Sequence, residues 1–244
     1  MSASRYVPHI LTFLSKTKLE QNAYELNFSK PDVKWLAGQH FMFFLPHFPF
    51  DSRGLFRVFT ISSPPTSDVL TITTRFFDDK SSSFKRNLLS LKEGSKVMAI
   101  GPSPIYDYFR ALDVESEYVF LVGGIGITPL HATLAYHLET GGKLNGTLLY
   151  ANHDNEFIYK EDIERATTQL EGFNTEYFSS DVSRITPDVI KKTKERYTDP
   201  KFIISGSRGF VDGMASMLIN DLAVDRRKII ADKFRPILFA GGGY

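Results

Sequence analysis

The sequence contains no cysteine among its 244 residues. This absence excludes disulfide bonds, zinc sites with cysteine ligands and iron–sulfur clusters held by thiolates. The six histidines do not replace such ligands. His131 and His137 lie six positions apart on one expected helix, not at the three- or four-residue spacing that puts two ligands on one face. The sequence therefore predicts no metal site.

Long apolar runs and an excess of charge are also missing. The longest apolar stretch, "FMFFLPHFPF", is interrupted by Pro46, His47 and Pro49, so nothing approaches the roughly 18 residues of a membrane-spanning helix. The formal net charge of +1 argues against nucleic acid as a partner. The N-terminal "MSASRYVPHI" lacks the apolar core and cleavage site of a secretory signal. We therefore expect a cytoplasmic protein with no membrane span.

Aromatic residues are abundant instead, at 14% of the chain with 21 phenylalanines. Such a content suits both β structure and the binding of flat ligands. Hydrophobic residues make up 42% and charged residues 23%, which is typical of a globular protein with a packed core. The length is sufficient for one large domain or two modest ones.

The first part of the chain, residues 6–101, consists of short β-like runs separated by Pro, Ser, Gly and Asp. The runs are "VPHILTFL", "AYELNFS", "HFMFFLP", "RVFTIS", "VLTITTRF" and "KVMAIG", and several alternate apolar with polar residues as half-buried strands do. One helix interrupts them: "SSFKRNLLSLKEG" puts Phe84, Leu88 and Leu91 on one face and ends at Gly94. This pattern predicts an N-terminal antiparallel β-barrel domain with one helix, over residues 1–112.

From Tyr118 onward, strands alternate with helices. The pairs are "YVFLV" with "TPLHATLAYHLET", "GTLLYA" with "YKEDIERATTQL", "NTEYF" with "TPDVIKKTKERY", and "KFIIS" with "RGFVDGMASMLINDL". Such alternation predicts a parallel sheet covered by helices on both faces. We therefore expect a C-terminal α/β domain over residues 117–244, joined to the barrel by a linker within Arg110–Glu117.

The stretch "LVGGIGITP" resembles a dinucleotide-binding loop, G-x-G-x-x-G, but does not match it. Gly124 and Gly126 fit the first two glycines, and Pro129 stands at the third. Thr128 is a suitable N-cap and Pro129 a suitable first helical residue, so the loop leads from a buried strand into a helix N-terminus. Glycines there allow a phosphate to approach the backbone. The alternative is an ordinary glycine-rich turn.

Two further stretches have a functional and a structural interpretation. In "RVFTISS", Arg57 and Phe59 share one face of a strand, beside the hydroxyls of Thr60 and Ser62. This set suits a flat cofactor that carries a phosphate, but it also fits an edge strand with a solvated arginine and a core phenylalanine. In "FIISGSRGF", Ser205 ends a strand at the edge where α/β sheets bind ligands. The alternative here is an ordinary βα turn.

Taken together and in this order, the motifs resemble those of the ferredoxin–NADP reductase family. "RVFT" is similar to the family's flavin motif R-x-Y-[ST], and "GGIGITP" matches its nucleotide motif G-G-x-G-x-T-P in full. "AGQHF", "TTRFFDDKSSSFKRNLLSLKEGSKV", "GPSP", "YAN" and "SGSRGFV" are similar to further family segments. The resemblance covers nearly the whole chain. It implies that the barrel binds flavin and that the α/β domain binds a nicotinamide nucleotide.

The resemblance also implies roles for individual residues. Arg57 would hold a phosphate, Phe59 would pack against the flavin ring, and Thr60 would bond near flavin N5. Thr60 and Ser205 would be the catalytic residues, with Ser205 and Thr128 beside the nicotinamide. A C-terminal aromatic, Tyr244 or Phe234, would cover the flavin. The full set of expected cofactor-binding residues is Arg57, Val58, Phe59, Thr60, Ser63, Thr73, Arg75, Ser82, Ser83, Gly123, Gly124, Gly126, Thr128, Pro129, Asp181, Gly206 and Tyr244.

The chain departs from the family pattern at four positions. Phe59 replaces a tyrosine, Ser205 replaces a cysteine, and Pro104 replaces a glycine. In "YFSSDVSRITP", Asp181 stands where NADPH-specific members carry residues for the 2′-phosphate. A carboxylate repels a phosphate and accepts hydrogen bonds from a ribose, so the sequence favours NADH. Arg184 leaves NADPH open as a donor.

The sequence thus predicts an NAD(P)H-dependent flavin oxidoreductase that binds FAD in preference to FMN. Hydride would pass from the nicotinamide to the flavin, and electrons would pass on to a separate redox protein, such as a ferredoxin-like protein, or to a small molecule. The Phe-rich stretch 41–50 is expected to form barrel core, or part of a docking surface. The alternative function is a flavin- or nucleotide-binding electron-transfer or sensor module without turnover of its own.

Overall fold

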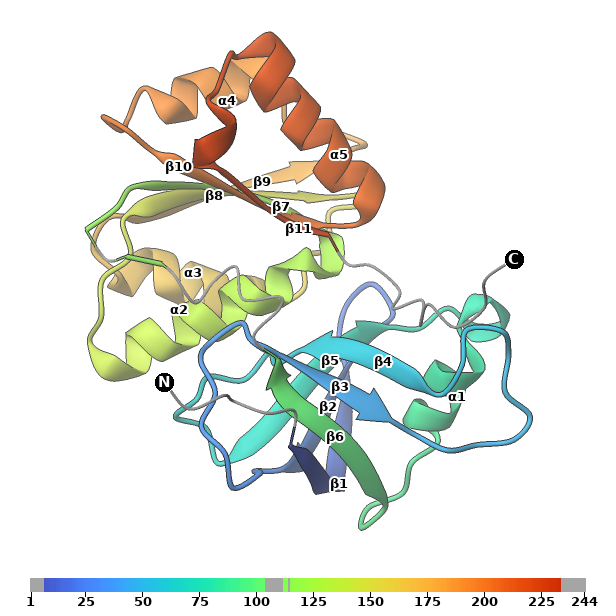
Figure 1. Ribbon diagram of the computed structural model, residues 1–244. Helices are drawn as coiled ribbons and strands as arrows, with labels where there is room; N and C mark the ends of the chain where they lie inside the picture. The colour runs from blue at the N-terminus through green and yellow to red at the C-terminus, as the bar shows by residue number, and fades with distance from the viewer. Residues whose placement is uncertain (1–6, 104–111, 114, 234–244) are drawn as a thin grey trace.

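The computed structural model describes residues 7–103, 112–113 and 115–233, which form two bodies (Figure 1). The first is an antiparallel six-stranded sheet in the order β4-β3-β6-β1-β2-β5. An isolated bridge between Ile61 and Ile72 joins the two ends of this order, so the sheet closes into a barrel. Its strands are β1 (Pro8–Lys18), β2 (Ala23–Ser29), β3 (His40–Phe44), β4 (Phe56–Thr60), β5 (Val69–Arg75) and β6 (Lys96–Ser103).

Alternation along these strands directs one side-chain set inward. The barrel core is rich in phenylalanine, and helix α1 (Ser83–Leu89) adds Phe84 and Leu88 to it. Ser82 is the N-cap of α1 and accepts a hydrogen bond from the Lys85 amide. A short 3₁₀ helix, η1 (Asp78–Lys80), precedes it. The helix is shorter than the sequence predicted, because the chain leaves it at Ser90.

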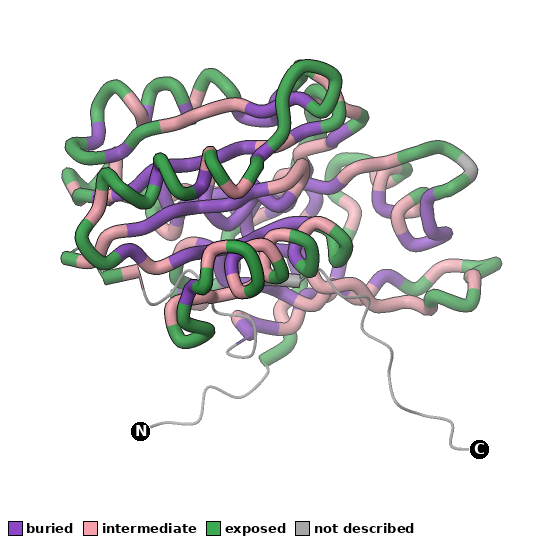
Figure 2. The backbone as a smooth tube through the Cα atoms, turned by 90° about the horizontal axis from the view of Figure 1, so that it is seen from above, coloured by how far each residue is buried: buried purple, intermediate pink, exposed green. Residues whose placement is uncertain are grey.

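The second body is a parallel sheet in the order β11-β10-β7-β8-β9. Its strands are β7 (Tyr118–Gly123), β8 (Gly146–Asn152), β9 (Phe173–Ser179), β10 (Lys201–Gly206) and β11 (Ile229–Lys233). The helical elements are η2 (Gly124–Ile127), α2 (Thr128–Thr140), α3 (Lys160–Gln169), α4 (Pro187–Lys194), α5 (Arg208–Ser216), the π-helix η3 (Met217–Asp221) and η4 (Arg226–Lys228). Helices α2 and α3 cover the face toward the barrel, and α4 and α5 cover the other (Figure 1). The strands are buried and the outer helix faces exposed (Figure 2).

This architecture confirms the predicted combination of an antiparallel barrel and a parallel α/β domain. The predicted boundaries at 112 and 117 fall between β6 and β7, in a segment described only in part. The sequence missed β11, because "IIADK" follows the basic turn of η4 and has no helix after it in the described chain. Among the described helices, none combines the length and apolar character needed to cross a membrane.

Candidate functional site

The loop after β7 is held close to β10, at the point where the strand order of the parallel sheet reverses. A Cβ atom on Gly126 would lie 2.5 Å from the Ser205 carbonyl oxygen, so only glycine permits this approach. Gly124 has a φ of +54°, which is readily adopted only by glycine. The Tyr150 hydroxyl donates to the Gly124 carbonyl at 3.0 Å. The loop is thus held by the packing of Gly126 against β10 and by the hydrogen bond from Tyr150 on β8.

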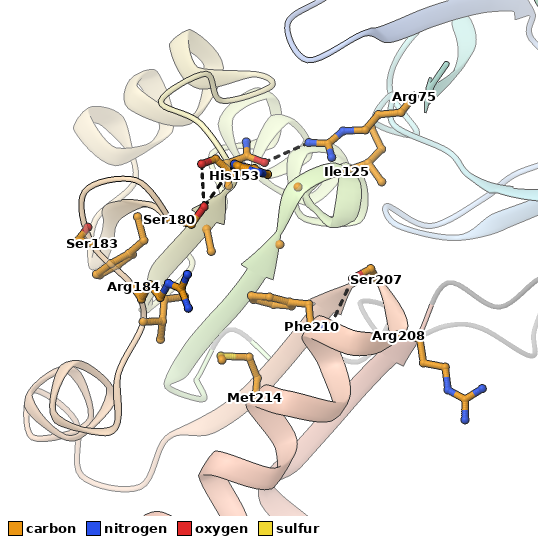
Figure 3. A pocket seen from close by; sticks show the side chains of 16 residues that line it. Arg75, Ile125, His153, Ser180, Ser183, Arg184, Ser207, Arg208, Phe210 and Met214 are labelled. Carbon is orange, nitrogen blue, oxygen red and sulfur yellow. Dashed lines mark hydrogen bonds between the residues drawn. The ribbon is translucent and has the colours of Figure 1, made fainter. Parts of the chain in front are cut away.

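A cleft of about 630 Å³ opens above this loop, at the carboxyl ends of β7, β8, β9 and β10 (Figure 3). Ligands of open α/β sheets bind at this edge. Arg75 and Arg184 lie on opposite sides of the cleft, whereas Arg208 points away from both. The lining residues are Arg75, Gly123, Gly124, Ile125, Ala151, Asn152, His153, Phe178, Ser180, Ser183, Arg184, Ile185, Ser207, Arg208, Phe210 and Met214.

Arg75 belongs to β5 of the barrel but reaches into the α/β domain. Its Nη2 donates to Asn152 Oδ1 at 3.1 Å and would lie 3.0 Å from a Cβ on Gly124. Burial lowers the pKa of Arg75, although the guanidinium stays charged. Its Nε has no partner among the described residues. The arginine therefore brings a desolvated positive charge from one domain to the glycine loop of the other.

Four other residues predicted to bind the nucleotide lie next to the loop but are not among the described lining residues of the cleft: Thr128, Pro129, Ser205 and Gly206. Thr128 is 2% exposed, and its hydroxyl donates to the Ile125 carbonyl at 3.2 Å. Pro129 lies in the first turn of α2 and Gly206 at the end of β10. Ser205 is fully buried, and its hydroxyl has no hydrogen-bond partner in the described part of the chain.

The turn after β9 is arranged differently from the sequence-based expectation. Arg184 and Ser183 line the cleft, whereas Asp181 is exposed and is not one of the described lining residues. Ser180 lines the cleft, and its hydroxyl donates to the His153 carbonyl at 2.8 Å. The NADH preference inferred from Asp181 stays a prediction, and Arg184 and Ser183 are the residues of this turn that line the cleft beside Ser180.

A second group of cations surrounds α1 on the barrel. The Arg57 guanidinium lies over the Phe84 ring at 5.4 Å, and its Nη2 has no partner among the described residues. Burial lowers the pKa of Arg57. Lys85 is held between strand and helix by a bond to the Arg75 carbonyl at 2.8 Å. Burial, followed by the charges of Arg57, Arg53 and Arg75, lowers the pKa of Lys85 to about 8.

One carboxylate balances part of this charge. Asp51 accepts hydrogen bonds from the Ser83 amide at 2.8 Å and from Arg53. Burial acts to raise the pKa of Asp51, but the bonds from Arg53 and Ser83 outweigh it and lower the value to about 2. The Ser83 hydroxyl is engaged by the Asp51 amide and His47. Asp51 belongs to no recognisable motif. Lys85 lies within the family-like segment "TTRFFDDKSSSFKRNLLSLKEGSKV", but no local pattern there indicates its burial beside the arginines.

Side chains of the predicted flavin motif are largely engaged within the protein. Phe59 is 8% exposed, and its ring packs against those of Phe43 and Phe84 at 5.6 and 6.1 Å. Thr60 bonds His40 Nε2 at 3.0 Å. The Ser63 hydroxyl donates to the Val69 carbonyl. Val58 is partly buried next to them, and Tyr244, Phe234 and Pro104 lie outside the described residues.

The Thr73 side chain is also engaged within the protein. Its hydroxyl contacts Ser62 and Tyr159, so it faces the α/β domain. Among the residues described, no cluster of histidine and carboxylate side chains has the geometry to hold a metal ion. Around β4 and α1, the barrel therefore offers a ligand the cations of Arg57 and Lys85 and the Thr60 hydroxyl, which bonds His40.

Comparison with solved structures identifies this arrangement. The ferredoxin–NADP⁺ reductase of Plasmodium falciparum, solved in complex with 2′P-AMP, superposes with a TM-score of 0.74 over 95% of this chain and 99% of that one, at 17% identity. The chain has the two-domain fold of ferredoxin–NADP reductases. The FAD/NAD-binding domain of a nitric oxide dioxygenase from Vibrio cholerae shares this reductase fold, with a TM-score of 0.74, 18% identity, and coverage of 92% and 98%.

Sequence comparison finds reductase subunits as relatives. The reductase subunit of a stachydrine N-demethylase from Rhizobium meliloti is 24% identical over 169 residues, 68% of this chain and 47% of that protein. The reductase subunit of a glycine betaine monooxygenase from Pseudomonas aeruginosa is 28% identical over 129 residues, 51% of this chain and 34% of that protein. The chain thus spans less than half the length of these relatives. No family model matches it.

Proposed function

We propose that the protein is an NAD(P)H-dependent flavin reductase that binds FAD and passes electrons to an acceptor. One observation carries this proposal: Arg75 of the barrel enters the cleft above the glycine loop of the α/β domain. A site made by both domains suits a reaction between two cofactors, one on each. The alternative, a cofactor-binding module without turnover, would not require a barrel arginine in the cleft of the α/β domain.

The chain's residues fit both cofactors. Half-buried Arg57 has a buried Nη2 with no partner among the described residues, and Lys85 lies in the same cationic group. These cations suit the diphosphate of FAD, which FMN lacks. Gly123, Gly124 and Arg75, which line the cleft, offer backbone and a charge to a nicotinamide nucleotide. When bound, the flavin would accept a hydride and release electrons.

An iron–sulfur acceptor with thiolate ligands would lie outside this sequence, since the sequence contains no cysteine. Phe48, Phe50 and Phe77 are 90%, 56% and 49% exposed on the barrel. Arg53 links the two loops that carry them through bonds to the Lys80 and Ser81 carbonyls. An apolar surface beside cations suits an acidic redox protein. We propose an oxygenase component as the acceptor, because two of the curated relatives are the reductase subunits of a demethylase and of a monooxygenase.

Reconstitution and turnover test this proposal. The flavin-free chain is titrated with FAD and FMN, and the loaded protein is assayed with ferricyanide, NADH and NADPH. We expect tighter binding of FAD, and turnover with at least one donor. Arg75→Ala should raise KM for the nucleotide by about tenfold, the scale of one charge-assisted hydrogen bond.

Arg196→Ala is the matched control, because Arg196 is exposed and pairs with Glu176 away from the cleft. Flavin binding without turnover would favour the module. A chain that binds neither flavin would overturn both interpretations.

A further inference from the structure

Tyr159 crosses the seam between the two domains. It belongs to the α/β domain, immediately before α3, but its hydroxyl contacts two residues of the barrel: Thr73 on β5, and Glu25 on β2 at 3.1 Å. Glu25 and Thr73 are cross-strand neighbours. Tyr159 is 9% exposed and has a φ of +63°. A side chain other than glycine keeps such a backbone conformation only when its surroundings favour it strongly.

His131 of α2 supports the tyrosine from the other side. The two rings are stacked, with centroids 3.6 Å apart and an angle of 7° between planes. The imidazole also spans the seam, because Nδ1 lies 2.9 Å from the Ser62 carbonyl oxygen of the barrel. Its Nε2 lies 3.0 Å from Asp162 Oδ2 on α3.

The hydrogen bonds around this pair have one consistent direction. The Tyr159 hydroxyl donates to the Glu25 carboxylate, so it accepts from Thr73, which in turn accepts from Ser62. Burial, with the nearby Glu25 carboxylate, raises the pKa of Tyr159, so the phenol keeps its proton.

Both nitrogens of the imidazole face acceptors, the Ser62 carbonyl oxygen and the Asp162 carboxylate. The hydrogen bond from His131 leads the causes that lower the pKa of Asp162, which agrees with an ionised carboxylate facing the ring.

We propose that Tyr159 and His131 form an interdomain clamp that holds the α/β domain in register with the barrel. Both are positioning residues: they contact Ser62, two residues after β4 ends at Thr60, and Thr73 on β5, whose hydroxyl bonds Ser62. The consequence for hydride transfer rests on the proposed function, whereas the clamp itself does not. Reacting atoms must lie within about 3–3.5 Å, and a displacement of about 1 Å can reduce the rate by about a hundredfold.

The absence of cysteine makes the clamp directly measurable. Cysteines introduced at exposed Ser90 on the barrel side and exposed Lys192 on α4 are the only thiols to carry spin labels. The distance distribution between the labels is recorded in the flavin-loaded protein. We expect a narrow distribution for the unmodified clamp and a broadened or shifted one for Tyr159→Phe, which keeps the ring and removes the hydroxyl.

Tyr197→Phe is the matched control. Its hydroxyl bonds Thr147 at 2.7 Å within the α/β domain alone, so its loss should leave the distribution unchanged. Glu25→Ala removes the barrel acceptor without touching the tyrosine, and we expect it to act like Tyr159→Phe. This second variant decides the question if Tyr159→Phe does not fold. Distributions of either seam variant that match Tyr197→Phe would overturn the clamp.

Rapid-mixing measurements then separate positioning from stability. In Tyr159→Phe we expect flavin reduction by NADH to slow by about tenfold, a fraction of the loss that misplacement by 1 Å allows, while flavin affinity is unchanged. A broadened distance distribution with an unchanged reduction rate would overturn the positioning role. If the wild-type flavin is not reduced by either nucleotide, the proposed function fails, and the label distances still decide whether the clamp exists.

Discussion

The two ligand regions of this chain are built in opposite ways. Above the parallel sheet, the site depends on missing side chains: Gly123 and Gly124 line the cleft, and buried Gly126 lets the loop approach Ser205 on β10. Among the described lining residues, one barrel residue, Arg75, adds charge. Around α1 the site contains more positive than negative charge, because Arg57 and Lys85 are partly buried and Asp51 balances only part of their charge. The first site needs space that larger side chains would fill, and the second needs partly buried positive charge. Substitutions at the first should therefore cause steric clashes and loss of stability, whereas substitutions at the second should weaken ligand binding.

The largest effect is expected at the glycine loop. A methyl group at Gly126 would lie 2.5 Å from the Ser205 carbonyl oxygen, and neither backbone can move freely. Gly126→Ala should lower the free energy of unfolding by about 3 kcal/mol, the upper range for overpacking, and abolish nucleotide binding. Urea denaturation and a nucleotide titration measure the two effects.

Gly213→Ala provides the matched comparison, because no atom lies within 4 Å of its added methyl on α5. It should raise the free energy of unfolding by up to about 1 kcal/mol. Equal losses in both glycine variants would show that helix and loop propensity, not the close approach to Ser205, limits this domain.

The next effect is expected at Arg57. Its orphaned Nη2 has no partner among the described residues, so Arg57→Ala removes a cation without breaking an ion pair. Flavin affinity should fall by about tenfold to a hundredfold, which corresponds to about 1.5–3 kcal/mol for a charge-assisted hydrogen bond. Isothermal titration with FAD measures it, and unchanged affinity would remove "RVFT" from the flavin site.

A pH dependence should follow from Lys85, whose pKa burial and nearby arginines lower from 10.5 to about 8. Above pH 8 the folded protein loses this charge, so affinity for FAD should fall, by at most about tenfold per pH unit. Between pH 8 and 10.5 the unfolded chain binds more protons than the folded one, so stability of the flavin-free protein should rise. Lys85→Arg should remove both trends; FAD titrations at pH 7 to 10 check this.

A smaller effect is expected at the turn after β9. Arg184 lines the cleft, and Asp181 is exposed outside the described lining. Arg184→Ala should raise KM for NADPH by about fivefold, the scale of a partly solvated ion pair, and leave KM for NADH unchanged. Asp181→Ala should change neither by more than about twofold. A larger response to Asp181→Ala would restore the sequence-based interpretation of this turn.

The same contrast explains what the sequence could predict. "GGIGITP" was interpretable because its pattern is local, a strand end followed by glycines, a threonine and a proline at a helix start, although the packing of Gly126 against Ser205 depends on the tertiary fold. The alternation of strands and helices was local as well, and it predicted both folds. The flavin motif was harder, since Phe59 and Thr60 find their partners, Phe84 and His40, in other strands and in α1.

Contacts between residues that only the tertiary fold brings together were not predicted from the sequence. Tyr159 and His131 lie 28 positions apart in the chain, and nothing in either segment indicates that their rings stack. Asp51 sits in a loop whose composition suggests only a turn, yet it accepts the Ser83 amide bond. Such pairs are decided by how the two domains pack, which local patterns do not encode.

The central claim is that the two domains bring a nucleotide and a flavin together for hydride transfer. Anaerobic mixing of the FAD-loaded chain with NADH or NADPH, followed by flavin absorbance, tests it most directly. We predict that the oxidised flavin band disappears with one reduced nucleotide consumed per flavin, and that Arg75→Ala slows this loss. A flavin band that persists with both donors would contradict the account.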